Sequence, residues 1–187
     1  LATLLAWLTG PEWVDWKYLL LIGLGSFAAG LLGLSEDLRG LSVPVRSAVL
    51  LLIALSSSVA LIWTVRGQGK DALIQEPGVH VGHWPVWMLV LLAIYGVLFV
   101  SSYINVANFM DGLNGISGLH GVIAGLAFAA AGWFSGYAWL AMAGLILAAG
   151  FAGFLPWNLT KPGAFLGDVG SYLLGGAVAI TSFAALV

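Results

Sequence analysis

Long stretches without Asp, Glu, Lys or Arg, made mostly of apolar residues, dominate the pattern of this chain. They cover residues 18–35, 47–65, 84–107, 112–160 and 169–187. Each reaches the roughly 18–20 residues with which a helix crosses the hydrocarbon core of a bilayer. The apolar residues follow one another continuously instead of alternating with polar ones, which favours membrane-spanning helices over strands.

The stretch 112–160 is too long for one span and suits two. The segment "WFSGY" at 133–137 predicts the turn between them, because glycine and serine loosen a helix and aromatic rings suit the membrane interface. The predicted fold is therefore all-α, a polytopic transmembrane helix bundle with about six spans. Residues 1–9 read as the tail of an earlier span. Because both ends lie in apolar sequence, we expect residues 1–187 to be a single integral-membrane domain, an internal fragment of a longer protein.

Composition supports a lipid environment. The chain is 61% hydrophobic and 7% charged, whereas a soluble domain carries about 25% charged residues. The net charge of −2 does not suggest a nucleic-acid partner. The absence of cysteine from the sequence excludes disulfide and thiolate chemistry within it.

Counting spans places the polar connections on two membrane faces. The connections at 36–46, 105–118 and 156–168 alternate with those at 66–83 and 133–137, so the first three must share one face. That parity brings four acids to one membrane surface: Glu36, Asp37, Asp111 and Asp168. Basic residues are split evenly between the faces and do not fix the orientation in the membrane. Arg39, Arg46 and Lys161 lie with the acids, and Lys17, Arg66 and Lys70 lie opposite.

The connection at 105–118 reads "NVANFMDGLNGISG". Asn105, Asn108 and Asp111 recur every third residue, so we expect them to share one face at the end of a helix. Carboxylate and amide oxygens directed at one point suit Mg²⁺, and the amides can also hydrogen-bond a sugar or a uracil ring. The alternative is that these polar residues only cap a membrane helix.

Two further stretches carry candidate chemistry. In "LSEDLRGLSVPVR" the adjacent acids Glu36 and Asp37 could hold a divalent metal or accept a proton, or could simply end a span at the interface. In "PWNLTKPGAFLGDVGS" Asp168 lies between two glycines at the start of the last span. There the backbone N–H groups could receive a phosphate or a metal-bound ligand, or Asp168 could be an N-cap. His120, inside a span, is expected to be packed or hydrogen-bonded rather than a ligand.

Together these three stretches resemble the motifs of the polyprenyl-phosphate N-acetylhexosamine-1-phosphate transferases, glycosyltransferase family 4. "NVANFMDGLNGISG" is similar to N-x-x-N-x-x-D-G-x-[ND]-G, "PWNLTKPGAFLGDVGS" is similar to F-N-x-x-P-A-x-x-F-x-G-D-x-G-S, and "SEDL" stands where the family has an Asp-Asp pair. Glu36 replaces the first acid of that pair. Asn114 replaces the second acid of D-G-x-D-G, which favours the branch that initiates O-antigen and related surface glycans over the peptidoglycan branch.

The resemblance implies a reaction and its partners. A HexNAc-1-phosphate would pass from a UDP-N-acetylhexosamine to a membrane polyprenyl phosphate, giving UMP and the polyprenyl-diphospho-sugar. Mg²⁺ is the implied cofactor, with Mn²⁺ as an alternative, and a homodimer is allowed. The implied location is the bacterial plasma membrane, with the motifs on the cytoplasmic face.

The resemblance also implies roles for residues. Asp168 and then Asp111 would hold the metal, and Asp37, Glu36 and Asp111 would be catalytic. The expected substrate-binding residues are Asn105, Asn108, Asn114, Asn158, Lys161, Gly167 and Ser171.

Two other functions fit a chain of this kind. A transporter or channel would place acids in the middle of its spans, whereas the motif acids here lie at span ends. A non-catalytic remnant that only binds polyprenyl lipid is the second alternative, because the chain has fewer spans than members of the family. The family's early basic-proline stretch and late histidine-rich loop are also not found within it.

Overall fold

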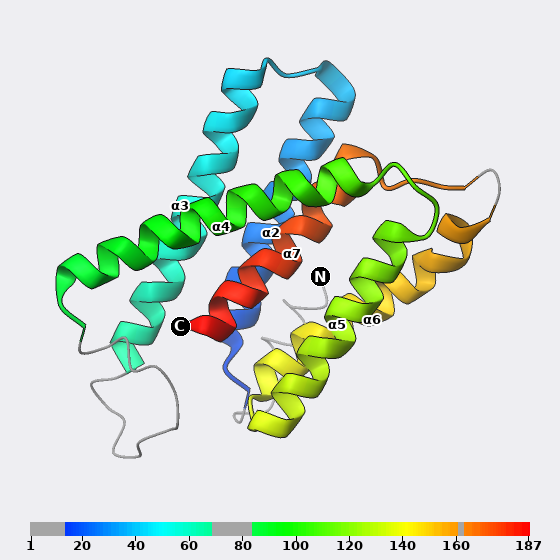
Figure 1. Ribbon diagram of the computed structural model, residues 1–187. Helices are drawn as coiled ribbons and strands as arrows, with labels where there is room; N and C mark the ends of the chain where they lie inside the picture. Colours follow the sequence, from blue (N-terminus) through cyan, green and yellow to red (C-terminus); the bar gives the residue numbers. More distant parts are fainter. Residues whose placement is uncertain (1–13, 69–83, 161–162) are drawn as a thin grey trace.

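The structure, a computed structural model, describes residues 14–68, 84–160 and 163–187. Within these ranges the chain forms six helices and no strand, and all six are long and apolar enough to cross a membrane (Figure 1). The helices are α2 (Trp16–Arg39), α3 (Val43–Gln68), α4 (Val86–Met110), α5 (Ile116–Ser135), α6 (Ala138–Leu159) and α7 (Gly167–Leu186). The predicted all-α fold with six spans is confirmed, and the tail expected at residues 1–9 lies outside the described residues.

The predicted division of the stretch 112–160 is also confirmed. α5 ends at Ser135, and Gly136 turns the chain in the left-handed region at φ 76° before α6 begins. This backbone conformation is one that glycine adopts without steric cost. The turn lies inside the predicted segment 133–137.

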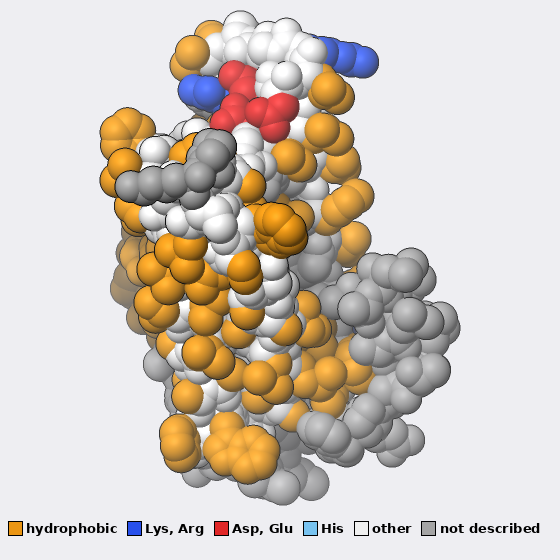
Figure 2. Space-filling model, turned by 90° about the vertical axis from the view of Figure 1, so that its right-hand side faces the viewer, with side chains coloured by type: hydrophobic (Ala, Val, Ile, Leu, Met, Phe, Trp, Pro, Cys, Tyr) orange, Lys and Arg blue, Asp and Glu red, His pale blue; other side chains and the backbone are white. Residues whose placement is uncertain are grey.

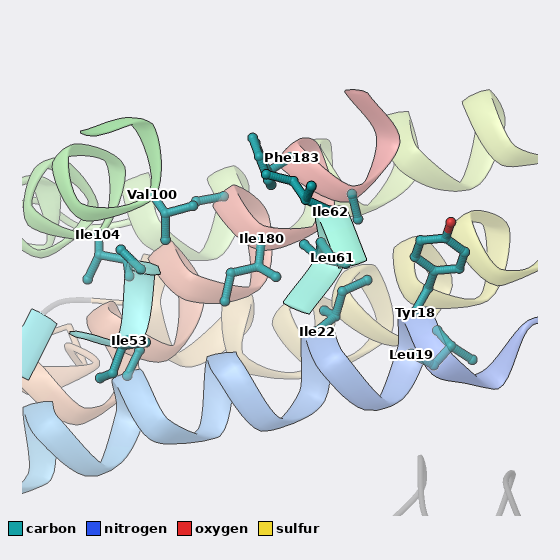
Figure 3. Close-up of a cluster of buried hydrophobic side chains, with 14 of the residues drawn as sticks. Tyr18, Leu19, Ile22, Ile53, Leu61, Ile62, Val100, Ile104, Ile180 and Phe183 are labelled. Atoms are coloured by element: carbon teal, nitrogen blue, oxygen red, sulfur yellow. The ribbon is translucent and has the colours of Figure 1, made fainter. Parts of the chain in front are cut away.

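Helix α7 lies at the centre of the bundle, between α2 and α4 (Figure 1). Its buried face includes Ile180 and Phe183, which pack in one cluster with Ile22 of α2, Leu61 of α3 and Ile104 of α4 (Figure 3). Leu61, Ile104 and Ile180 have no exposed surface. Because α7 is enclosed by three helices, its first turn is held in a fixed place relative to the ends of α2 and α4.

Helices α5 and α6 form a tightly packed hairpin. A Cβ atom built on Gly125 would lie 2.4 Å from the backbone nitrogen of Ala148, and one built on Gly144 would lie 2.3 Å from that of Ala129. The two backbones therefore touch directly, as small residues allow between membrane helices.

Three connections meet at one end of the bundle. The α2–α3, α4–α5 and α6–α7 connections lie at this end, and the α5–α6 turn lies at the other (Figure 1). Hydrogen bonds join the first three connections, so the predicted shared end is confirmed. Figure 2 shows acidic side chains gathered at this end above a surface that is mostly hydrophobic.

Candidate active site

The site is built around the first turn of α7. The backbone N–H groups of Asp168 and Val169 donate to the two carboxylate oxygens of Asp37, Oδ1 at 3.1 Å and Oδ2 at 3.0 Å. Asp37 belongs to the last turn of α2, so a residue far away in sequence caps α7. The N-cap residue Leu166 makes no side-chain cap. The alternative that Asp168 caps its own helix is therefore wrong, and the N–H groups expected to receive a phosphate already have an anionic partner.

The carboxylate of Asp168 points away from its own helix backbone toward α4. Its Oδ1 accepts a 2.5 Å hydrogen bond from Nδ2 of Asn108, and the same nitrogen donates to Oγ of Ser171 at 2.9 Å. Oδ2 of Asp168 has no hydrogen-bond partner among the described residues, and the residue is partly exposed. One oxygen is thus held in place and the other remains available to a ligand.

Asp111 connects two of the motif segments. It ends α4, and its Oδ1 accepts from Oγ of Ser117 at 2.6 Å while its Oδ2 accepts from the backbone nitrogen of Leu166 at 2.9 Å. The first bond closes the α4–α5 connection and the second holds the segment that leads into α7. Asp111 therefore braces the backbone beside Asp168. Each of its oxygens keeps a lone pair that could reach a ligand.

Glu36 is engaged within the α2–α3 connection. Its Oε2 accepts from the backbone nitrogen of Leu41 at 2.9 Å, and its Oε1 lies 3.3 Å from Nη1 of Arg46 in an ion pair. The additional methylene of Glu relative to Asp gives the side chain the reach to span this turn. The neighbouring acids Glu36 and Asp37 thus have separate partners.

Two of the predicted substrate-binding asparagines hold the backbone. Asn158 is completely buried, its Oδ1 accepts from the nitrogen of Gly118 at 3.1 Å, and its Nδ2 donates to the carbonyl of Ala164 at 2.8 Å. A side chain without exposed surface and with both ends bonded to protein is placed for structure, not for substrate contact. Nδ2 of Asn114 donates to the carbonyl of Thr160 at 2.7 Å, and this side chain remains exposed.

The remaining predicted substrate-binding residues do not all lie beside Asp168. Asn105 does not join Asn108 beside Asp168, because steps of three residues rotate by about 60° each around a helix. Its amide instead donates to the carbonyl of Ser101 in its own helix. Ser171 is buried, and its hydroxyl accepts the hydrogen bond from the side chain of Asn108. Gly167 adopts φ 65°, which favours glycine. Lys161 lies outside the described residues.

The predicted metal can be compared with these contacts. The described residues contain no group of three or more His, Cys, Asp or Glu side chains arranged to hold a metal ion. Mg²⁺ does not need such a group, since it is usually bound by one or two carboxylates, waters and substrate phosphates. The unpartnered Oδ2 of Asp168 fits that kind of binding, and Asp111 is the second candidate.

Sequence reasoning missed Ser117 and the pairing role of Arg46. Ser117 is buried in the first turn of α5 and is the donor that fixes Oδ1 of Asp111. Its place two residues after "DGLNG" was a usable signal, because a hydroxyl six residues beyond an acid can close the intervening turn. Arg46 lies ten residues after Glu36, and the two side chains meet because the chain turns between α2 and α3. The spacing in the sequence does not by itself indicate this ion pair.

An apolar groove adjoins the site between α4 and α5. It has a volume of about 520 Å³ and is lined by Tyr103, Met110, Ile116, Leu119, His120, Ile123, Ala124 and Ala127. Met110 directly precedes Asp111, so one end of the groove adjoins the acidic cluster. Within the groove the hydroxyl of Tyr103 and Nε2 of His120 lie 2.7 Å apart, which confirms the expectation of a hydrogen-bonded histidine.

Comparisons with known proteins agree with these motifs. A phospho-N-acetylmuramoyl-pentapeptide-transferase of Oceanobacillus iheyensis is 29% identical over 171 residues, an alignment that covers 83% of this chain and 48% of that protein. The chain thus spans about half the length of the curated relative that it matches. The family profile described as "Glycosyl transferase family 4" matches residues 19–185, which include all three motifs. The chain therefore belongs to glycosyl transferase family 4.

Proposed function

We propose that the protein containing this chain transfers a HexNAc-1-phosphate from a UDP-sugar to a membrane polyprenyl phosphate. A phosphate oxygen of the lipid attacks the phosphorus atom that carries the sugar, the bond from that phosphorus to UMP breaks, and polyprenyl-diphospho-sugar forms. The product initiates a cell-envelope glycan. Membership of the family supports this reaction class, and the named relative acts on a phospho-N-acetylmuramoyl-pentapeptide.

The observation that carries the proposal is the arrangement around Asp168. Two motifs that are far from Asp168 in sequence supply Asp37, Asn108 and Asp111, and each of these residues fixes Asp168 or the backbone beside it. Oδ1 of Asp168 is held by Asn108, whereas Oδ2 of Asp168 has no hydrogen-bond partner among the described residues. The arrangement is that of a carboxylate held ready for a ligand at a helix end.

The reaction brings a diphosphate and a lipid phosphate together, so their negative charge must be neutralised. When bound, Mg²⁺ supplies that neutralisation and polarises the phosphorus being attacked. Asp168, with Asp111 as second candidate, would hold the metal, and Asn108 keeps the Asp168 carboxylate in one orientation. Exposed amides at Asn105 and Asn114 are the proposed contacts for the sugar or diphosphate.

The lipid acceptor does not require a strong base. A phosphate monoester loses its second proton near pH 6, so at neutral pH its attacking oxygen is already largely deprotonated. This chemistry is compatible with the contacts of Glu36 and Asp37, whose oxygens hold the α2–α3 connection and α7. The groove between α4 and α5 supports a prenyl acceptor, because its lining is mostly apolar and includes Met110, the residue before Asp111.

A transporter is less well supported by the structure. Glu36 and Asp37 lie in the last turn of α2, Asp111 ends α4 and Asp168 is in the first turn of α7. An ion pathway would place acids within the spans. A site at the helix ends instead suits a water-soluble nucleotide sugar that meets a lipid at the membrane surface, and we propose that this surface is the cytoplasmic one.

The test uses the protein made from the whole reading frame, reconstituted in liposomes with undecaprenyl phosphate. Transfer of sugar phosphate and release of UMP are measured with UDP-N-acetylglucosamine and, separately, with UDP-N-acetylmuramoyl-pentapeptide. We expect transfer from one donor, its loss with EDTA, and its return with Mg²⁺ or Mn²⁺. Asn114 favours the first donor, and the named relative favours the second. UMP release from neither donor in folded protein would refute the proposal.

A further inference from the structure

Helix α2 touches the first turn of α7 at Gly33. A Cβ atom on Gly33 would lie 2.1 Å from the carbonyl oxygen of Asp168, 2.4 Å from its carbonyl carbon and 2.7 Å from the nitrogen of Val169. All three are backbone atoms, which cannot rotate away as the end of a side chain can. Only a glycine at position 33 allows this approach.

The same face of α2 also holds the neighbouring N–H groups. Asp37 follows Gly33 by four residues, about one helical turn, and therefore lies on the same face. It accepts the hydrogen bonds from the nitrogens of Asp168 and Val169. Gly33 and Asp37 thus contact the same short backbone segment, and that segment carries the Asp168 side chain.

We propose that Gly33 and Asp37 form a seat on α2 that sets the position of Asp168, and that both are positioning residues for the reaction. The inference rests on the proposed function, in which Asp168 is the ligand-binding carboxylate. In this assignment Asp37 acts through Asp168 and does not touch the acceptor phosphate. Gly33 gains a role because its missing side chain sets how closely α7 approaches.

The size of the effect follows from the distances. Real Cβ atoms essentially never lie within 3.0 Å of a backbone atom. With alanine at position 33, the distance from its Cβ to the carbonyl oxygen of Asp168 must therefore increase from 2.1 Å to at least 3.0 Å, which displaces the start of α7 from α2. A misplacement of about 1 Å at a catalytic group can cost about a hundredfold in rate. Gly30 is a matched control on the same helix, because its Cβ would lie 3.3 Å from side-chain atoms of Leu173 and needs only a small adjustment.

The experiment compares Gly33→Ala, Gly30→Ala and Asp37→Ala in the whole protein in liposomes. We expect Gly33→Ala to lower kcat about a hundredfold with the KM for polyprenyl phosphate changed less than about threefold. Gly30→Ala should stay within about threefold of the unmodified protein. The double variant of Gly33 and Asp37 should lose little more than the worse single variant, because both changes disturb the same seat.

Hydrogen–deuterium exchange supplies a measurement that needs no activity. Amides of residues 168 and 169 should exchange faster in Gly33→Ala and in Asp37→Ala than in Gly30→Ala. If Gly33→Ala fails to accumulate, Asp37→Ala still tests the seat, since its exposed side chain can be truncated without a clash. Unchanged exchange in Asp37→Ala, or additive kinetic losses in the double variant, would overturn the proposal. Absence of transfer by the unmodified protein would instead count against the proposed function.

Discussion

Replacing Asp168 by Asn should remove most of the proposed transferase activity while leaving the fold nearly intact. The substitution keeps the shape of the side chain, so Oδ1 can still accept the hydrogen bond from Asn108. It converts the unpartnered Oδ2 into an NH₂ group, which cannot bind a metal ion. The change therefore removes the negative charge and the ligand atom together, at the one carboxylate oxygen of the four site acids that the described residues leave without a hydrogen bond.

The contacts of Asp168 allow the expected loss of stability to be compared with the expected loss of activity. For stability, the Asn108 hydrogen bond changes from charge-assisted to neutral at a cost of about 1 kcal/mol. Losing a negative charge at the start of α7 adds about 0.3–1 kcal/mol. The Asp37 cap remains, because it binds backbone atoms. For catalysis, losing one electrostatic contact to the transition state costs about 2.7–4 kcal/mol, a factor of about 10²–10³ in kcat.

The assay measures UMP release by the reconstituted protein at saturating Mg²⁺, with thermal unfolding recorded on the same preparations. Asp15→Asn is the matched control, since Asp15 begins α2 at the opposite end of the bundle and Asn caps a helix as well as Asp does. It should retain nearly full activity. If Asp168→Asn has a thermal unfolding temperature close to that of the unmodified protein and keeps more than about a third of the activity, Asp168 does not bind the ligand as proposed.

Three further outcomes follow from the contacts at the same end of the bundle. Cysteines introduced at Ser42 and Ala164 should react with a membrane-impermeant thiol reagent from the same side of sealed vesicles, and one at Ser135 should react from the opposite side. Asn158→Ala should destabilise the protein by about 2–4 kcal/mol, because the buried N–H of Gly118 and the C=O of Ala164 lose their partner, while the KM values of the properly folded fraction stay unchanged. Ser117→Ala should lower kcat about tenfold, since Asp111 loses the shorter of its two hydrogen bonds.

Each of these outcomes has its own comparison. If the cysteines introduced at Ser42 and Ala164 react from opposite sides, the α2–α3 and α6–α7 connections cannot form one site. Asn105→Ala is the control for Asn158, because among the described residues the exposed Asn105 bonds only to its own helix, and equal destabilisation by both would contradict the structural role of Asn158. Ser182→Ala is the control for Ser117→Ala, because it removes a hydroxyl that donates to the carbonyl of Val178 within its own helix α7. If Ser182→Ala lowers kcat as much as Ser117→Ala does, the effect of Ser117→Ala does not depend on its hydrogen bond to Asp111.

The spans and their faces were readable from the sequence for a simple physical reason. Lipid offers no partner to a backbone N–H or C=O, so a long uncharged stretch has to be a helix, and consecutive helices have to alternate in direction. This constraint alone brought the segments 36–46, 105–118 and 156–168 to one end. The turn near Gly136 followed from local residue types in the same way.

The roles of the individual acids depended on contacts between segments. Asp37, Asp111 and Asp168 are similar in sequence, each an acid near the end of an apolar stretch. Only the packing of α7 between α2 and α4 shows that Asp37 caps α7, that Asp111 holds the segment before it, and that Asp168 keeps one oxygen without a partner. These bonds join residues 55 or more positions apart along the chain.

The roles of Gly33 and Asn158 also could not be predicted from the sequence, because they depend on how the helices pack. Gly33 is one of 26 glycines in the sequence, and nothing in its neighbourhood distinguishes it from Gly30. Its importance lies in a close approach to the backbone of α7, which is 135 residues away and exists only in the folded chain. Asn158 resembles a polar substrate contact in sequence, yet burial turns its amide inward. Local patterns determined which segments are helices and where they end, whereas the side-chain roles were decided by which helix ends the bundle brings together.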